Sequence, residues 1–210
     1  MRKNSSIIKH YEDCFAKHGA TNKGVDWPNQ SDLTKRYNVM LEQIDFSSKD
    51  GISILDFGCG FAGLKKHIDG LGLDLDYTGA DAGKSFIDFC RSEIPESNFH
   101  YLKSNNDISS LGSFDYVVCC GVWTVKNEVK HEDMFSMFSE DIKKLWKITN
   151  KGIAFNLMAT HVDWERDDLF HVSMDTLAGF LCKEVTRDFV IRNDYGLYEY
   201  TVYLRKNNEG

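Results

Sequence analysis

One short apolar run that ends in a glycine-rich turn constrains the fold of this chain more than any other feature. Within the sequence ISILDFGCGFAG, Ser53–Phe57 has the composition of a buried strand. Gly58, Gly60 and Gly63 follow at Gly-x-Gly-x-x-Gly spacing, which permits a tight turn, close ligand approach and close packing of the next helix. A strand, a glycine turn and a helix in this order predict an α/β sheet that binds a ligand at the turn. A tight turn without a ligand is the alternative.

The remainder of the chain continues the alternation of strands and helices. Patterns of apolar residues predict strands near 76–80, 98–102, 114–120 and 152–158, and helices near 62–69, 83–93, 134–146 and 174–181. The C-terminus differs, because alternating residues at 185–191, turn residues at 193–196 and a β-rich run at 198–204 predict a hairpin. We therefore predict a doubly wound, mostly parallel seven-stranded sheet with a C-terminal antiparallel hairpin, a Rossmann-like α/β fold.

Composition limits the organisation and the partners. The 210 residues suit one compact domain, in which residues 1–50 form a helical lid and substrate segment over a ligand-binding domain at 51–210. A net charge of −7 disfavours nucleic acid, and the apolar run Ile7–Ile8 is too short for a signal peptide or a membrane span. We expect a cytoplasmic protein without a membrane partner. The six cysteines lack paired zinc spacing, so no metal site is expected.

Two carboxylates accompany the glycine turn. Asp81 ends the second expected strand, where a carboxylate accepts hydrogen bonds from the ribose hydroxyls of a nucleoside cofactor; capping of the following helix is the alternative. Asp56 precedes the first glycine by two residues. Its charge would repel a pyrophosphate but suits an ammonium group. This favours a cofactor with an amino-acid end over a nicotinamide dinucleotide.

The segments LDFGCGFAG, YTGADAG and FDYVVCCGVW resemble the class I S-adenosylmethionine-dependent methyltransferases, and the resemblance covers most of residues 50–205. It implies that S-adenosylmethionine is the cofactor and that its methionine and ribose lie along the glycine turn. It also implies an adenine above the second strand end and a sulfonium beside the fourth. The implied cofactor-binding residues are Asp56, Gly58, Cys59, Gly60, Asp81, Ala82, Asn106, Asp107 and Gly121.

The segment before the sheet is rich in candidate site residues. Arg36 matches the geometry of the cofactor carboxylate, or is a solvated helix residue. Tyr11 and Trp27 enclose the sulfonium or pack the lid, and we place Trp27 in the acceptor site as well. Trp123 enters the same site after the fourth strand, with core packing as its alternative.

Two histidines follow the fifth strand. His161 is the candidate general base, because the pKa of a free histidine lies near neutrality, and His171 is a candidate substrate-binding residue. A structural or surface role is the alternative for both.

These features predict a methyltransferase that acts on an oxygen or nitrogen atom of a small metabolite, such as a sugar or secondary-metabolite intermediate. A homodimer is compatible with the sequence. One alternative is an S-adenosylmethionine-binding regulatory protein without turnover. A nicotinamide-dependent oxidoreductase is the other, but Asp56 opposes it and the sequence has no evident Tyr-x-x-x-Lys pair.

Overall fold

A seven-stranded sheet forms the centre of the computed structural model, which describes residues 5–47 and 51–206. The strand order is β3-β2-β1-β4-β5-β7-β6. All pairs are parallel except β5 with β7 and β7 with β6, so the predicted C-terminal antiparallel hairpin is confirmed. The strands are β1 (Ile52–Phe57), β2 (Leu75–Asp81), β3 (Asn98–Tyr101), β4 (Phe114–Cys119), β5 (Thr149–Met158), β6 (Phe189–Arg192) and β7 (Glu199–Arg205).

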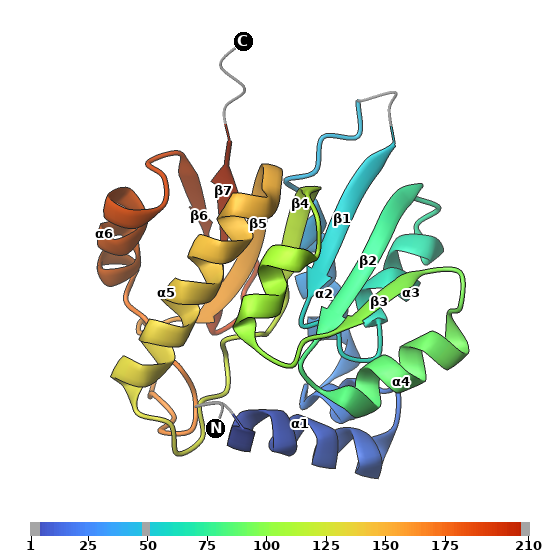
Figure 1. Ribbon diagram of the computed structural model, residues 1–210. Coiled ribbons are helices and arrows are strands. Elements are labelled where there is room, and N and C mark those ends of the chain that lie inside the picture. The colour runs from blue at the N-terminus through green and yellow to red at the C-terminus, as the bar shows by residue number, and fades with distance from the viewer. Residues whose placement is uncertain (1–4, 48–50, 207–210) are drawn as a thin grey trace.

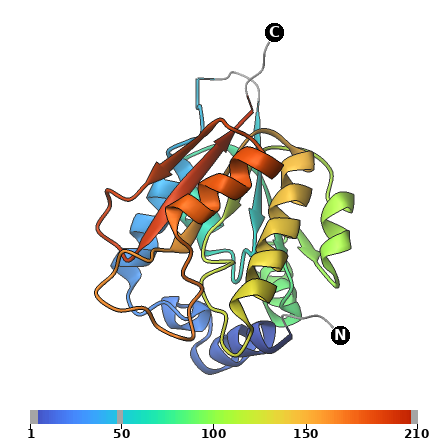
Figure 2. The same cartoon turned by 90° about the vertical axis from the view of Figure 1, so that its left-hand side faces the viewer.

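Helices cover both faces of the sheet, as expected for a doubly wound fold (Figures 1 and 2). Successive β1 residues show why, since Ile54 packs in one apolar cluster and Leu55 in the other. One cluster includes α2, α3 and α4, and the other includes α5 and α6. These helices are α2 (Gln30–Leu41), α3 (Gly63–Gly70), α4 (Lys84–Glu93), α5 (His131–Ile148) and α6 (Met174–Glu184).

The first 47 residues divide into two parts with different positions. Helix α1 (Ser5–His18) crosses the end of the sheet at which the parallel strands finish, and the short 3-10 helix η1 (Asn22–Val25) follows it (Figure 1). Helix α2 instead belongs to the body of the domain, because Met40 is buried and the Tyr203 hydroxyl donates to the Val39 carbonyl. Only α1, η1 and the segment up to α2 therefore occupy the position of a lid. The proposed boundary at residue 50 lies outside the described residues.

Element boundaries near the hairpin differ from those expected. The alternation from Val185 predicts a strand, but α6 continues to Glu184 and β6 begins at Phe189. The amide groups of Val185 and Thr186 donate to the Leu181 carbonyl and close the helix there. The residues between β6 and β7 form a longer loop whose end, Leu197 and Tyr198, reaches the candidate site.

Candidate functional site

The turn after β1 is a backbone feature that only glycine fits well. Gly58 has φ +80°, and its amide donates to the Ala80 carbonyl of β2 at 2.7 Å. A Cβ atom on Gly58 would lie 2.6 Å from Val122 Cγ2, so the turn is packed directly against the segment after β4. Three strand ends thus meet at one point, where the sequence predicts ligand binding.

Asp81 connects the glycine turn to the end of β2. Its carboxylate accepts the Gly60 amide at 2.9 Å and the Gly83 amide at 2.7 Å. Burial raises the pKa of Asp81, and the bonds from backbone amides oppose that shift. Gly83 is the N-cap of α4, so Asp81 orders the helix start as well as the turn. The same carboxylate lines a cavity, where it has further acceptor capacity for a ligand.

Asp56 is a buried carboxylate that forms no ion pair with any residue in 5–47 or 51–206. It is 2% exposed, and it accepts a hydrogen bond of 2.7 Å from the Tyr77 hydroxyl. Burial raises the pKa of Asp56 to about 7, and the nearby Asp81 acts in the same direction. An ammonium group would compensate this charge, which fits the predicted role of Asp56.

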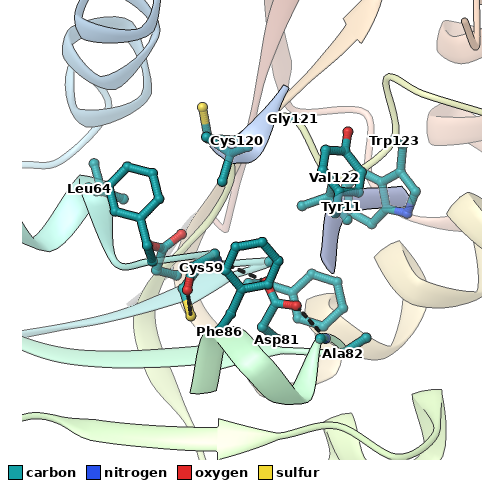
Figure 3. A pocket seen from close by; sticks show the side chains of 18 of the residues that line it. Tyr11, Cys59, Leu64, Asp81, Ala82, Phe86, Cys120, Gly121, Val122 and Trp123 are labelled. Carbon is teal, nitrogen blue, oxygen red and sulfur yellow. Dashed lines mark hydrogen bonds between the residues drawn. The ribbon is translucent and has the colours of Figure 1, made fainter. Parts of the chain in front are cut away.

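These groups line a cavity that we call the inner cavity (Figure 3). Asp81, Ala82 and Phe86 lie on one side of it, and Gly121 and Val122 lie across from them. Helix α1 closes the cavity with Tyr11, and the Glu12 carboxylate fastens that helix by accepting the Ser85 amide and hydroxyl, both at 3.0 Å. The predicted cofactor-binding residues that line the inner cavity are Tyr11, Asp56, Gly58, Cys59, Gly60, Asp81, Ala82 and Gly121.

A buried polar chain fixes the backbone at Gly121. The Gly121 amide donates to Asn156 Oδ1 at 2.7 Å, and Asn156 Nδ2 donates to Glu199 Oε1 at 3.0 Å. Glu199 is fully buried and pairs with Arg36, whose Nε and Nη2 lie 2.9–3.0 Å from its oxygens. The Arg36 guanidinium stacks 3.8 Å from the Trp27 ring centroid. Trp27 in turn covers Gly121, where an added Cβ would lie 2.6 Å from Trp27 Cζ2.

An outer cavity of about 620 Å³ adjoins the inner one. The two share Tyr11, Val25 and Trp27 as lining residues. The other walls of the outer cavity come from α1, from the loop after β5 and from the loop before β7. This size is typical of sites that bind small ligands. Two small molecules, one in each cavity, would therefore contact each other beside Tyr11 and Trp27.

Several predicted site residues lie elsewhere. Arg36 lines the outer cavity only, and its charge is already paired with Glu199. Trp123 lines the inner cavity, yet its ring packs against Phe57, Phe138 and Phe155 in the core. Its packing matches the core interpretation, and because Trp123 does not line the outer cavity its place in the acceptor site stays a prediction without a supporting contact.

The two residues predicted at the adenine edge belong to a 3-10 helix, η2 (Asn105–Ser110), and neither lines the inner cavity. Asp107 completes a capping box with Ser104, and Asn106 Oδ1 accepts from Lys144 Nζ at 3.1 Å. Local capping therefore occupies these side chains. Their contact with a cofactor stays a prediction that no contact in the structure supports.

The histidines after β5 also differ from each other. His161 is exposed and lines neither cavity, so its role as a base stays a prediction without a supporting contact. His171 lines the outer cavity, but its Nδ1 bonds to the Ala159 carbonyl at 2.7 Å and its Nε2 accepts the Arg166 amide at 3.2 Å. With both ring nitrogens engaged, His171 holds the loop that forms the cavity wall.

One cluster has the chemistry of metal ligands among the residues that the structure describes. His10, Cys14 and Asp26 place one ligand atom each within 4.8 Å of one another, and His10 Nε2 lies 2.8 Å from Asp26 Oδ2. All three side chains are at least partly exposed. The sequence spacing gave no sign of this cluster, because the turn after α1 brings Asp26 back to the helix. The absence of a metal site stays a prediction.

Sequence reasoning missed Glu199, Asn156 and Asp141. The first two fix Gly121, and the only signal was a charged or amide residue within an otherwise apolar strand. Asp141 on α5 lines the inner cavity, and burial raises its pKa to about 6. Its position among polar residues of an amphipathic helix gave no signal of a cavity.

Comparison with known proteins agrees with this architecture. No family model matches the sequence. The "Putative methyltransferase Rv1506c" of Mycobacterium tuberculosis is 25% identical over 166 residues, covering 76% of this chain and 96% of the relative. The magnesium protoporphyrin IX methyltransferase of Synechocystis, crystallised with bound SAH, has a TM-score of 0.65 at 12% identity and covers 97% of this chain and 96% of that one.

A second solved structure, an S-adenosylmethionine-dependent methyltransferase from Clostridium acetobutylicum, has a TM-score of 0.56 at 10% identity; the match covers 95% of this chain and 98% of the other. The resemblance and the Rossmann-like methyltransferase fold predicted from the sequence are thereby confirmed. The cofactor that belongs to this fold is S-adenosylmethionine. No helix in residues 5–47 and 51–206 has the length and apolar character needed to cross a bilayer.

Proposed function

We propose that this chain, which has the fold of the class I S-adenosylmethionine-dependent methyltransferases, transfers a methyl group to an oxygen or nitrogen atom of a small metabolite. The observation that carries the proposal is the pair of adjoining cavities that share Tyr11 and Trp27. The inner cavity would hold the cofactor, and the outer cavity would hold the acceptor. Their shared walls put the reacting atoms within one enclosed space.

The inner cavity fits the cofactor because two of its carboxylates can bind groups that the cofactor supplies. Asp56 is buried without a cation, and the ammonium of the methionine moiety would supply one. Asp81 retains acceptor capacity for the ribose hydroxyls after binding two backbone amides. Ala82 and Phe86 offer apolar surface beside it for the adenine. When bound, S-adenosylmethionine supplies an activated methyl group on a sulfonium.

Alignment is the main task left to the protein. The hydrogen bonds from Gly121 to Asn156 and from Asn156 to Glu199 fix the position of the backbone at the end of β4. Trp27 covers this backbone at Gly121. Tyr11 contributes its ring at the boundary, and burial raises the pKa of its hydroxyl well above the usual value, so this side chain stays neutral. Helix α1 excludes water from the reacting atoms.

Binding and turnover test separate parts of the proposal. Titration calorimetry with S-adenosylmethionine, S-adenosylhomocysteine and NAD should show heat for the first two only; binding of NAD alone would return the oxidoreductase alternative. Formation of S-adenosylhomocysteine over a panel of hydroxylated and amino metabolites should then identify the acceptor. Binding without turnover on any acceptor would favour the regulatory alternative.

A further inference from the structure

The rim of the outer cavity presents two aromatic side chains to solvent. Trp164, in the loop after β5, is 72% exposed, and Tyr198, in the loop before β7, is 64% exposed. Both line the outer cavity although they are 34 positions apart in the sequence. Exposed large rings that gather at one cavity are typical of a surface that a ligand covers.

Three carboxylates belong to the lining of the same cavity. Asp26, Asp32 and Asp163 line the outer cavity, and within the described residues Asp163 has no hydrogen-bond or ion-pair partner. Each of these carboxylates can accept hydrogen bonds from the hydroxyl groups of a ligand. The lining therefore combines flat apolar rings with acceptor oxygens.

Charged side chains of both signs line the outer cavity. Three cationic side chains, Lys23, Arg36 and Arg166, stand against the three carboxylates. Arg36 and Arg166 already pair with Glu199 and Asp168. Arg36 is 7% exposed and its Nη1 has no hydrogen-bond partner in residues 5–47 and 51–206, so this lining residue has one buried donor left to satisfy.

We infer that the outer cavity binds a sugar ring, an inference that rests on the proposed function and names its acceptor class. A pyranose has apolar C–H faces for Trp164 and Tyr198, hydroxyl donors for the carboxylates, and ring or hydroxyl oxygens for Arg36 Nη1. A planar phenol would cover the rings but brings only one or two hydroxyl donors for three carboxylates, and an ammonium group has no acceptor for Arg36 Nη1.

O-methylation of a sugar hydroxyl requires a place for its proton. In this reaction the hydroxyl oxygen forms a bond to the methyl carbon, the methyl–sulfur bond breaks, and sulfur retains the electron pair. The proton passes to the Asp26 carboxylate, which lines the outer cavity next to Trp27 and is 2.8 Å from His10 Nε2. The Asp26 side chain is itself partly exposed and releases the proton to solvent, and His10 orients it.

The acceptor class is tested by saturation-transfer NMR with free, methyl-glycosidic and nucleotide-linked hexoses, in the presence of S-adenosylhomocysteine. Catechol and an aliphatic amine serve as comparison ligands. We expect sugar ring protons to receive saturation, and Trp164→Ala and Tyr198→Ala to raise the KM for the productive sugar about tenfold with kcat little changed. Phe46→Ala is the matched control, since Phe46 is 45% exposed and lies outside both cavities.

Two outcomes would overturn the sugar assignment. One is saturation of catechol or the amine but of no sugar; the other is equal sugar binding by wild type and Trp164→Ala. Both leave the proposed function standing, because calorimetry with S-adenosylmethionine tests that separately. Asp26→Asn should lower kcat with little change in KM and alter the pH profile, and an unchanged profile would exclude the proton path.

An independent observation concerns Asp141 in the inner cavity. One of its oxygens, Oδ1, is buried and has no hydrogen-bond partner in the described part of the chain, while Trp123 and Asn105 are the side chains that interact with its carboxylate and oppose the rise of its pKa. A buried acceptor without a donor is costly, so a ligand donor at this position would stabilise the protein. Leu102 and Met137 line the same cavity and provide apolar surface there.

We propose that Asp141 accepts the exocyclic amine of the cofactor adenine, in the place that sequence reasoning gave to Asn106 and Asp107. The inosine analogue of S-adenosylhomocysteine has a carbonyl oxygen where adenine has this amine, so a carboxylate repels it and a carboxamide does not. Calorimetry should show that wild type prefers the adenine compound at least about tenfold and that Asp141→Asn loses this preference. Glu140→Gln, at the exposed neighbouring position, is the control.

Retention of the adenine preference in Asp141→Asn would exclude this assignment. Loss of binding to both compounds in Asp141→Asn alone, with a folded protein by circular dichroism, would also count against it, because a general loss indicates structural damage and not base selectivity. Failure of wild type to bind either compound would contradict the proposed function itself.

Discussion

The inner and outer cavities are adjacent but are built in opposite ways. The ends of three neighbouring parallel strands supply the backbone at the centre of the inner cavity, with Gly58 and Gly121 at positive φ, and larger side chains from the helices complete its walls. Side chains from the lid and two distant loops form the outer cavity. The first is a property of the fold and the second of a particular set of loops. Cofactor binding is accordingly expected to tolerate loop changes that abolish acceptor binding.

Glu199 bonds to Arg36 in the wall of the outer cavity and, through Asn156, to Gly121 in the wall of the inner cavity. Of the substitutions considered, removal of Glu199 should lower the stability of the protein most. Glu199→Ala leaves Arg36 buried without its partner and frees Asn156 from one of its bonds. We expect a loss of about 3–5 kcal/mol in the free energy of unfolding, measured by urea denaturation. Glu42→Ala, which removes an exposed partner of Arg192, should cost less than about 1 kcal/mol. Equal effects would show that the buried pair contributes no more to stability than the exposed one.

Asp81→Ala tests the inner cavity alone. It removes the acceptor for the ribose and for the Gly60 and Gly83 amides. We expect the affinity for S-adenosylmethionine to fall by about tenfold to a hundredfold in calorimetry, the value of one or two hydrogen bonds to a charged group. Trp164→Ala should leave the same affinity unchanged. Unaltered binding by Asp81→Ala would contradict the cofactor site.

The raised pKa of Asp56 predicts that a rise in pH lowers the stability of the protein but increases its affinity for S-adenosylmethionine. Its pKa is about 7 in the folded protein and about 4 when unfolded, so the folded chain holds the proton between these values. Stability from this group is therefore present at low pH and is lost as the pH rises through 7. Asp56→Asn removes the dependence, and its Tm should exceed that of wild type by a margin that grows from pH 5 to pH 8.

The same carboxylate must be ionised to bind an ammonium. Wild-type affinity for S-adenosylmethionine should thus weaken by up to about tenfold for each pH unit below 7. Asp56→Asn should bind weakly throughout and lose most of this slope. Calorimetry at several pH values measures both, and a wild-type affinity that does not change with pH would contradict the assigned partner.

His161→Ala should have the smallest effect. Because His161 is exposed and lines neither cavity, we expect kcat to stay within about twofold of wild type on the productive acceptor, as for most surface substitutions. His10→Ala should lower kcat more. A large loss in His161→Ala with normal S-adenosylmethionine binding would restore the role predicted from its position after β5.

The sequence by itself determined the glycine turn and the strand ends of the inner cavity, because these parts are local. The strand Ile52–Phe57, the turn at Gly58 and the acid at the end of β2 lie close in the chain, and parallel pairing necessarily brings the strand ends together. The element order and the terminal hairpin were predictable for the same reason, since periodicity and turn residues are short-range signals. The partners of individual side chains were not predictable in this way, and the capping box that Ser104 forms with Asp107 is an example.

Only the tertiary structure decided the outer cavity and the polar chain behind it. Arg36 and Glu199 are 163 positions apart, and neither position reveals that the other will neutralise it. Trp27, Trp164 and Tyr198 come from three segments whose meeting depends on loop paths that periodicity does not encode. Local patterns specify backbone conformation, whereas pairing between distant side chains depends on the complete packed chain.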